Sequence, residues 1–311
     1  MEIVAVENLV KRYKELLALD HFNMQIEKGE VFALLGPNGC GKTTAINCIL
    51  QLLTFDKGVI RLFGEDMSPS RYDIKRRIGI VPQNIAVFEE LSVRDNIDYF
   101  CALYVRDRHT RKRLVDEAIE FVGLEDYTKF RPRKLSGGLI RRLNIACGIA
   151  HKPELIFFDE PTVAVDPQSR YSILEGIKSF SWGGATIVYT SHYMEEVEEI
   201  GTRIMIMDHG QTLACGTNNE LKAMISTGEK IQVEVADLPI DVLSSIKKMP
   251  FVQRAIYEGN ELDVSCTTGK NNLGHILELL QKHDRSFGRV YSEPPTLNDV
   301  FLELTGSELR D

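Results

Sequence analysis

The segment Gly36-Pro37-Asn38-Gly39-Cys40-Gly41-Lys42-Thr43-Thr44 decides the fold of this 311-residue chain. It fits the template GxxxxGK[ST], in which glycines let backbone amides turn toward a phosphate where a side chain would collide. The apolar run 31–35 before it predicts a buried strand, and a helical pattern follows from about residue 42 to 53. The loop is therefore expected to hold phosphate at a helix N-terminus, with Lys42 at the β and γ phosphates and Thr43 at Mg²⁺.

A pair of carboxylates, Asp159 and Glu160, ends a second apolar run at 155–158. Ligands of open α/β sheets bind at the carboxyl ends of the strands, so this pair is expected beside the phosphate loop. There Asp159 would orient Mg²⁺, and Glu160 would polarise an attacking water as a general base. A strand that ends in Asp-Glu is weak evidence alone, because acidic residues also stabilise helix starts. Together with the loop it indicates phosphoryl chemistry.

A third motif separates this chain from other phosphate-loop proteins. Residues 134–139, Lys-Leu-Ser-Gly-Gly-Leu, precede the acidic pair and resemble the LSGGQ signature of ATP-binding cassette (ABC) ATPases. The motif order along residues 1–220 is that of the family, and Leu139 replaces the commoner Gln at a variable position. The resemblance implies an α/β fold of the P-loop NTPase class, with a RecA-like core, an antiparallel β subdomain and a helical insert at about 88–150. It also implies hydrolysis of ATP with Mg²⁺.

The resemblance assigns roles to residues outside the loop. Tyr13 matches the aromatic residue that stacks on adenine, Gln83 matches the Q-loop residue, and His192 matches the switch histidine that contacts the γ-phosphate. Ala164-Val165-Asp166 matches the D-loop. The expected catalytic residues are Glu160, His192, Gln83 and Lys42, and the expected metal ligands are Thr43, Gln83 and Asp159. The expected nucleotide contacts are Tyr13, Gly36, Pro37, Asn38, Gly39, Cys40, Gly41, Lys42, Thr43, Thr44, Ser136, Gly137, Gly138 and Asp166.

The signature itself predicts a partner. Ser136 is expected to cap the helix 137–149, whose first amides then form a second anion site. The chain holds one set of motifs, so it resembles half of a sandwich in which one subunit's signature closes over the other's ATP. We therefore expect a second ATP-binding subunit, either identical or a close relative, and a separate membrane-spanning permease. The expected location is peripheral, at the cytoplasmic face of the cell membrane.

The composition excludes several classes of protein. With 37 basic and 45 acidic residues the net charge is −8, so nucleic acid is not an expected partner. No apolar run is long enough to span a bilayer, and the first residues lack the pattern of a secretory signal. The six cysteines show neither disulfide-type nor zinc-type spacing, and free thiols in a reducing compartment are expected.

A second, smaller domain is expected at 229–311, after the polar stretch 226–229. Predicted strands and helices follow in the order βαββαβ, which is the ferredoxin-like arrangement of a small α+β domain. The predicted elements are a strand at 231–235, a helix near 240–248, strands at 252–257 and 262–266, a helix near 271–283 and a strand at 287–292. The tail 294–306 resembles the tails of ATPases that serve drug, antibiotic or lipid exporters, so export is favoured over import.

Two other functions stay open. A non-transport cassette ATPase would usually carry long coiled coils, zinc insertions or two cassettes, and the sequence has none of these. An ATP-gated regulatory module would bind ATP without turnover, and it would not need both Glu160 and His192.

Three local expectations concern the environment of single side chains. Cys40 lies near a helix N-terminus, so its thiol pKa is expected to be lowered. The acidic run 195–199 is expected to be a solvated face at a helix start. Most of the basic residues that flank the signature are also expected to be solvated, namely Arg131, Arg133, Lys134, Arg141 and Arg142.

Overall fold

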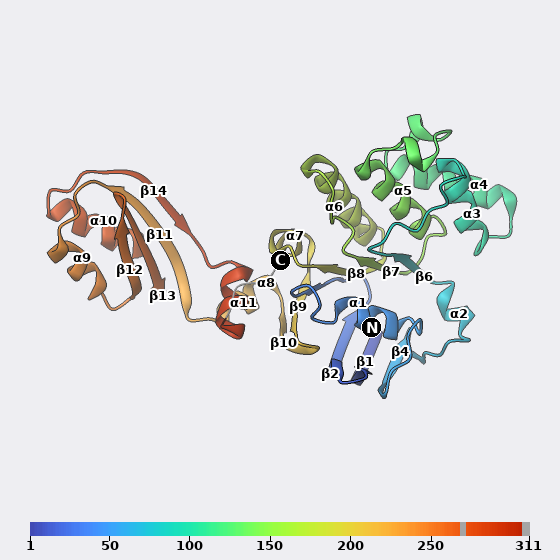
Figure 1. Ribbon diagram of the computed structural model, residues 1–311, viewed down its shortest axis with the longest axis horizontal. Helices are drawn as coiled ribbons and strands as arrows, with labels where there is room; N and C mark the ends of the chain where they lie inside the picture. The colour runs from blue at the N-terminus through green and yellow to red at the C-terminus, as the bar shows by residue number, and fades with distance from the viewer. Residues whose placement is uncertain (268–271, 307–311) are drawn as a thin grey trace. The chain divides into compact units, whose positions relative to one another are not determined.

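The computed structural model describes residues 1–267 and 272–306 and divides the chain into two compact units (Figure 1). The first unit is Met1–Asn218, and the second begins at Asn219. The sequence placed the end of the first domain at 220 and the start of the second at 229. The boundary lies earlier, because β11 already begins at Thr227 and most of α8 (Asn218–Ala223) falls in the second unit. The predicted residues 307–311 lie outside the described ranges.

A six-stranded sheet with the order β10-β9-β3-β8-β7-β6 forms the centre of the first unit. Its strands are β3 (Val31–Leu35), β6 (Ile78–Val81), β7 (Leu155–Asp159), β8 (Thr186–Ser191), β9 (Arg203–Asp208) and β10 (Gln211–Gly216). All neighbours are parallel except β10, which pairs antiparallel with β9. Leu35 lies opposite Ser191, and Asp159 lies opposite Thr190. The carboxyl ends of β3, β7 and β8 therefore meet at one edge.

Alternate residues of the central strands enter two separate hydrophobic cores. Phe32 and Phe157 belong to the core that includes α1 (Lys42–Ile49), whereas Phe158 and Tyr189 belong to the core with α5 (Gly137–Ile149) and α6 (Pro167–Trp182). All residues of β3, β7 and β8 are buried. A parallel sheet that is covered on both faces gives such continuous apolar runs, as the sequence predicted.

The antiparallel subdomain is a four-stranded sheet with the order β2-β1-β4-β5. Its strands are β1 (Glu2–Tyr13), β2 (Leu16–Glu27), β4 (Lys57–Leu62) and β5 (Glu65–Asp66), and α2 (Tyr72–Lys75) follows. β1 and β2 are longer than the alternating stretches in the sequence, since register shifts and the positive φ angles of Asn8 and His21 interrupt the alternation. The extra length brings Tyr13 to the end of β1, where it pairs with Leu16.

The helical insert contains α3 (Val93–Ala102), α4 (Arg108–Phe121), the short 3₁₀ turns Glu125–Tyr127 and Pro132–Lys134, and α5. Ser92, Asp107 and Ser136 cap the three α-helices by accepting the backbone N–H three residues on. α6 and α7 (Met194–Ile200) then alternate with β7, β8 and β9. No helix in the described ranges is long and apolar enough to cross a membrane.

Asn96 on α3 holds the segment that leads from β6 into the insert. Its side chain is fully buried, and Oδ1 accepts the N–H of Phe88 at 2.7 Å. Nδ2 donates to the carbonyl oxygens of Phe88 and Ser92, both at 3.0 Å. One side chain thus supplies the acceptor for the N–H of Phe88 and adds donors to two carbonyl oxygens of this segment.

The second unit confirms the predicted βαββαβ order. Its elements are β11 (Thr227–Val235), α9 (Ile240–Lys247), β12 (Val252–Glu258), β13 (Glu261–Thr267), α10 (Asn272–Lys282) and β14 (Phe287–Glu293). The strands pair antiparallel in the order β12-β13-β11-β14. Both helices pack on the same face of the sheet, where Ile246 and Ile276 meet Val233 and Val264 (Figure 1). Thr296 and Asp299 form a capping box at the start of α11 (Leu297–Thr305).

Replacement of Asn96 by alanine is expected to destabilise the protein, because it leaves the buried N–H of Phe88 without its acceptor. The free energy of unfolding should fall by about 2–3 kcal/mol. Asn84→Ala, at an exposed position, is the matched control. Chemical denaturation followed by circular dichroism measures both variants, and equal stability of the two would contradict the role assigned to Asn96.

Candidate active site

Two glycines give the loop between β3 and α1 its shape. A Cβ at position 36 would lie 2.2 Å from the carbonyl oxygen of Met207. Gly41 has a φ of 114°, and a Cβ there would lie 2.7 Å from the carbonyl oxygen of Ala18. The fold therefore requires glycine at both positions, independently of any ligand.

Lys42, the first residue of α1, extends its ammonium group back over this loop. Nζ donates to the carbonyl oxygens of Gly36 at 2.7 Å and Pro37 at 3.1 Å. It also lies 3.1 Å from Oε1 of Glu160, and the lysine side chain is only 4% exposed. The positive charge is thus held in a defined place between the loop and the acidic pair.

Thr43 and Asp159 form an oxygen-rich pair next to Lys42. The Thr43 hydroxyl donates to Asp159 Oδ2 at 2.9 Å, and the Thr190 hydroxyl donates to Oδ1 at 2.7 Å. Burial raises the pKa of the Asp159 carboxyl, while these two hydrogen bonds act in the opposite direction. Hydroxyl and carboxylate oxygens are the ligands that Mg²⁺ takes from proteins, with substrate phosphates and water completing its shell. The donor set therefore fits magnesium.

Glu160 is the point at which the predicted catalytic residues meet. Gln83 Nε2 donates to Glu160 Oε2 at 3.2 Å, and His192 Nδ1 lies 3.4 Å from the same oxygen. Lys42 approaches the other carboxylate oxygen. The φ of Glu160 is 47°, and its N–H donates to the Thr190 hydroxyl at 3.0 Å. Non-glycine residues in this left-handed region concentrate at functional sites, where surrounding contacts hold the strained backbone.

Lys42, Thr43, Gln83 and Glu160 line a cavity of about 250 Å³, whereas Asp159 and His192 are not among its lining residues. Tyr13 is 44% exposed at its edge, and the Lys11 ammonium lies 5.0 Å from the centroid of the tyrosine ring. The cavity is lined by Tyr13, Leu16, Leu17, Ala18, Asn38, Gly39, Cys40, Gly41, Lys42, Thr43, Thr44, Gln83, Glu160, His209 and Gly210. His209 and Gly210, in the turn between β9 and β10, were missed because neither belongs to a motif.

The signature residues do not line this cavity; they pack against the D-loop. Asp166 Oδ1 accepts the N–H of Ser169 at 2.9 Å and caps α6. A Cβ at Gly138 would lie 2.4 Å from Ser169 Oγ and 3.1 Å from Asp166 Oδ2, so only glycine fits there. Ser136 and Gly137 are exposed. The predicted site residues thus fall into two groups, and the signature presents its helix start to solvent.

Arg141, one of the basic residues beside the signature, is buried instead of solvated. It is 6% exposed, and Nη1 donates to the carbonyl oxygen of Gln83 at 2.7 Å. Asn144 follows Arg141 by three residues, on the same buried face of α5, and its side-chain oxygen accepts the N–H of Ala86 at 3.0 Å. The two residues attach α5 to the loop that carries Gln83. The sequence signal for their burial was spacing, because Gly138, Arg141 and Asn144 recur every three residues and so lie on one face of α5.

Two expectations about charge are wrong. Cys40 is 4% exposed, and burial raises the pKa of its thiol because desolvation outweighs the nearby positive charge of Lys42. Glu196 is 3% exposed, although its neighbours Glu195 and Glu199 are exposed as predicted. Glu196 lies one helical turn before buried Ile200, and this spacing places both residues on the inner face of α7.

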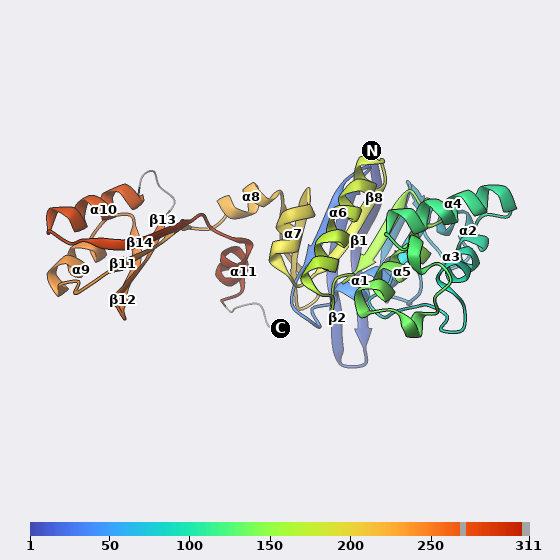
Figure 2. The same ribbon diagram turned by 90° about the horizontal axis from the view of Figure 1, so that it is seen from above.

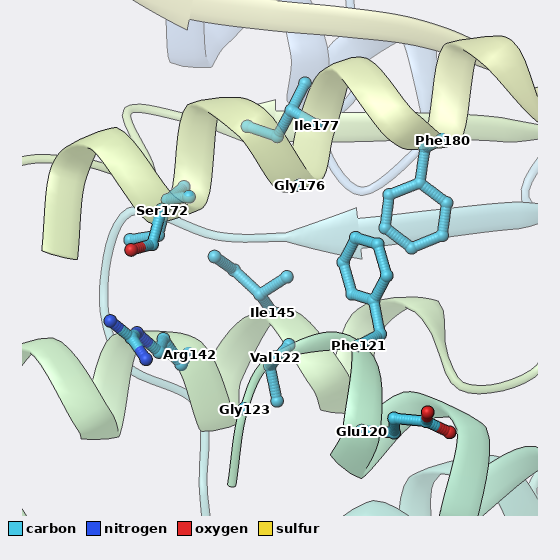
Figure 3. Close-up of a pocket in the computed structure, with 11 residues that line it drawn as sticks. Glu120, Phe121, Val122, Gly123, Arg142, Ile145, Ser172, Gly176, Ile177 and Phe180 are labelled. Atoms are coloured by element: carbon cyan, nitrogen blue, oxygen red, sulfur yellow. The ribbon is translucent and has the colours of Figure 1, made fainter.

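A second cavity, of about 220 Å³, lies between α4, α5 and α6 (Figure 3). Phe121 and Phe180 stand together at one side, with their ring centroids 4.3 Å apart, and Arg142 lies at the other (Figure 3). None of the predicted site residues lines it. The cavity at the phosphate loop is therefore the candidate active site.

Comparison with known proteins supports the same conclusion. Residues 19–163 match the family model described as ABC transporter. The linearmycin resistance ATP-binding protein LnrL of Bacillus subtilis (strain 168) is 36% identical over 99% of this chain and 100% of its own length. The Nod factor export ATP-binding protein I of Ralstonia nicotianae is 32% identical over 99% of this chain and 95% of its own length. A daunorubicin resistance ATP-binding protein of Streptomyces coeruleorubidus is also 32% identical, over 99% of this chain and 97% of its own length.

Solved structures share the fold of the first unit. A dimeric ATP-binding cassette in a post-hydrolysis state with ADP and Pi superimposes with a TM-score of 0.64 at 25% identity. The match covers 69% of this chain and 98% of that one. CbiO1 of Clostridium perfringens, part of the ABC transporter complex CbiONQ, has a TM-score of 0.66 at 28% identity, and the match covers 71% of this chain and 91% of that one. This chain belongs to the family of ABC transporter ATP-binding proteins.

Proposed function

We propose that the protein is the ATP-hydrolysing subunit of an ABC exporter and acts through a separate membrane permease at the cytoplasmic face. The observation that carries this proposal is the convergence of Lys42, Gln83 and His192 on Glu160, beside the Thr43–Asp159 pair. Relatives that match the whole chain are named for antibiotic resistance or Nod factor export. These names favour export over import, and they favour a drug-like, peptide or lipid-like substrate.

Binding of ATP is assigned to the phosphate loop and Tyr13. Loop amides and Lys42 hold the phosphates, and the exposed Tyr13 ring offers a face for the adenine. Thr43, Asp159 and Gln83 would hold Mg²⁺, which when bound neutralises charge on the phosphate oxygens. Because the fold itself requires the glycines at 36 and 41, the phosphate loop has its shape before ATP binds.

Hydrolysis is assigned to Glu160 as the general base. Its carboxylate would take a proton from water, and Gln83 and His192, within 3.2 and 3.4 Å of Oε2, orient it and the attacking water. Phosphoryl transfer requires mainly positioning and charge stabilisation, so a base held by several neighbours suits this reaction.

A second subunit, identical or closely related, is proposed to complete each site. Ser136 and Gly137 are exposed and lie outside the phosphate-loop cavity of their own chain. A helix start with free amides binds anions, so these residues are suited to the ATP of a partner subunit. The Asp166 loop packs against Gly138 and would enter the same interface.

The permease is proposed to contact the surface beside Gln83. Ile85, Phe88 and Tyr99 are 40%, 45% and 46% exposed, and the rings of Phe88 and Tyr99 meet at 4.9 Å. Exposed aromatic clusters of this kind mark protein interfaces. Arg141 ties this loop to α5, so a movement imposed here would reach the signature.

Glu160→Gln should lower the ATPase rate of the purified protein by about 10²–10⁴-fold, the usual contribution of a general base. Affinity for a fluorescent ATP analogue should change little, because Lys42 and the loop remain. Glu195→Gln, on the exposed face of α7, is the control. A variant that hydrolyses ATP at the parental rate would refute Glu160 as the base, and a parent that binds without turnover would favour a regulatory module.

The two signature glycines should respond differently to alanine. Gly138→Ala pushes against Ser169 and Asp166 and should cost about 1–3 kcal/mol of folding stability. Gly137→Ala meets no atom closer than 4.0 Å and should leave stability unchanged. In the Glu160→Gln background, however, Gly137→Ala should abolish the ATP-dependent dimer seen by size-exclusion chromatography. Dimerisation at the parental level would argue against the sandwich.

Export is tested by co-expression with any polytopic membrane protein that a neighbouring gene encodes. ATP-dependent uptake of candidate substrates into inside-out vesicles is expected with the parent and should be absent with Glu160→Gln. Failure of the two proteins to copurify from membranes would exclude that permease, and transport in the opposite direction would refute export.

A further inference from the structure

A buried carboxylate, that of Glu196 on α7, lies behind the site and is not used by the mechanism above. It is 3% exposed, and its Oε2 accepts three hydroxyl groups. Thr162 donates at 2.9 Å, Tyr189 at 2.7 Å and Ser191 at 2.9 Å. Three donors on one oxygen form a compact, fully buried polar cluster, which we call the Glu196 cluster.

The donors come from the segments that carry the catalytic residues. Thr162 lies two positions after Glu160, and Ser191 directly precedes His192. The Ser191 hydroxyl oxygen also accepts the N–H of Tyr193 at 2.9 Å, so the backbone on both sides of His192 is held. A single carboxylate oxygen thus connects the loop after β7 with the loop after β8.

Arg170 extends the Glu196 cluster to the D-loop. Its Nε lies 3.3 Å from Glu196 Oε1, and its guanidinium lies 4.7 Å from the ring centroid of Tyr193. Arg170 is in the first turn of α6, where its backbone N–H donates to the carbonyl oxygen of Asp166 at 2.9 Å. α6 and α7 lie beside each other in both views (Figure 1, Figure 2) and are in contact.

Stability alone does not account for a charge in this position. A buried ion pair must offset the desolvation of both groups, and apolar residues of similar volume often stabilise a protein as well or better. What a carboxylate adds is geometry, because it holds several donors at fixed angles around one point. The loops that the Glu196 cluster joins are those whose relative position sets the distance from Glu160 to His192.

We propose that Glu196 is a positioning residue for ATP hydrolysis. It holds the loops of Glu160 and His192 in their reactive arrangement, and through Arg170 it makes that arrangement sensitive to the D-loop, for which a place in the subunit interface is proposed above. This inference rests on the proposed ATPase function.

The test is the steady-state kinetics of Glu196→Gln, which keeps the size of the side chain and removes its charge. The kcat for ATP should fall about tenfold or more, with the KM for ATP within about twofold, because positioning acts on the transition state and not on nucleotide binding. The thermal midpoint of the variant should stay close to that of the parent. Glu195→Gln, adjacent in sequence but exposed, should retain parental kcat.

Three further variants keep the test decisive if Glu196→Gln folds poorly. Tyr189→Phe removes only one donor and should show a smaller fall in kcat with unchanged KM. Arg170→Gln should reduce kcat, and Arg170→Lys should restore part of it. A double-mutant cycle between Arg170→Gln and Glu196→Gln should be non-additive, since the two groups act as a pair.

Parental kcat in a folded Glu196→Gln protein would overturn the inference. So would a lower thermal midpoint with unchanged kcat per nucleotide-binding site, because that result is what a purely structural role gives. Absence of hydrolysis by the unsubstituted protein would overturn the proposed function and this inference together, so the two failures are distinguishable.

Discussion

The parallel pairing of β3, β8 and β7 is the constraint on which the rest of the site depends. It brings Leu35 opposite Ser191 and Asp159 opposite Thr190, so the loops after all three strands leave the sheet at one edge. The phosphate loop, the acidic pair and His192 are far apart in sequence, and this register alone makes them neighbours. The two different cores on the faces of this sheet hold the register, since a slip by one residue would move each side chain into the opposite core, where it does not fit.

Around this edge the structure maintains polar groups in a buried setting, which is unfavourable unless each has a partner. Glu160 is held by Lys42, Gln83 and His192, and Asp159 by two threonine hydroxyls. The Glu196 cluster forms a further layer behind them, and Arg141 joins the Gln83 loop to the signature helix. The proposed catalytic groups are therefore supported by residues that do not line the phosphate-loop cavity.

Much of the fold and most of the candidate site were predictable because their signals are local. The loop template, the apolar strands that end in acidic residues and the capping serines are short patterns. The βαββαβ order followed from the change between strand-like and helix-like spacing of apolar residues along the chain. The full length of β1 and β2 could not be read from the sequence, because register shifts interrupt their alternation. Glu196 and Cys40 were misjudged, and Arg141 could not be told apart from its solvated basic neighbours, for one reason: whether a charged or reactive side chain faces solvent depends on which elements pack over it.

The sequence by itself determined the motifs from which the chemistry is proposed: a phosphate-loop template, an acidic pair at a strand end, a signature and the order in which they occur. Residue type and spacing are sufficient for that, because each motif acts through backbone amides or side chains close together in the chain. Only the tertiary structure decided which groups meet. It separated the exposed signature from its own phosphate loop, buried Glu196 between the loops of Glu160 and His192, and desolvated Cys40. Such contacts arise between residues distant in sequence, where no local pattern reports burial or register.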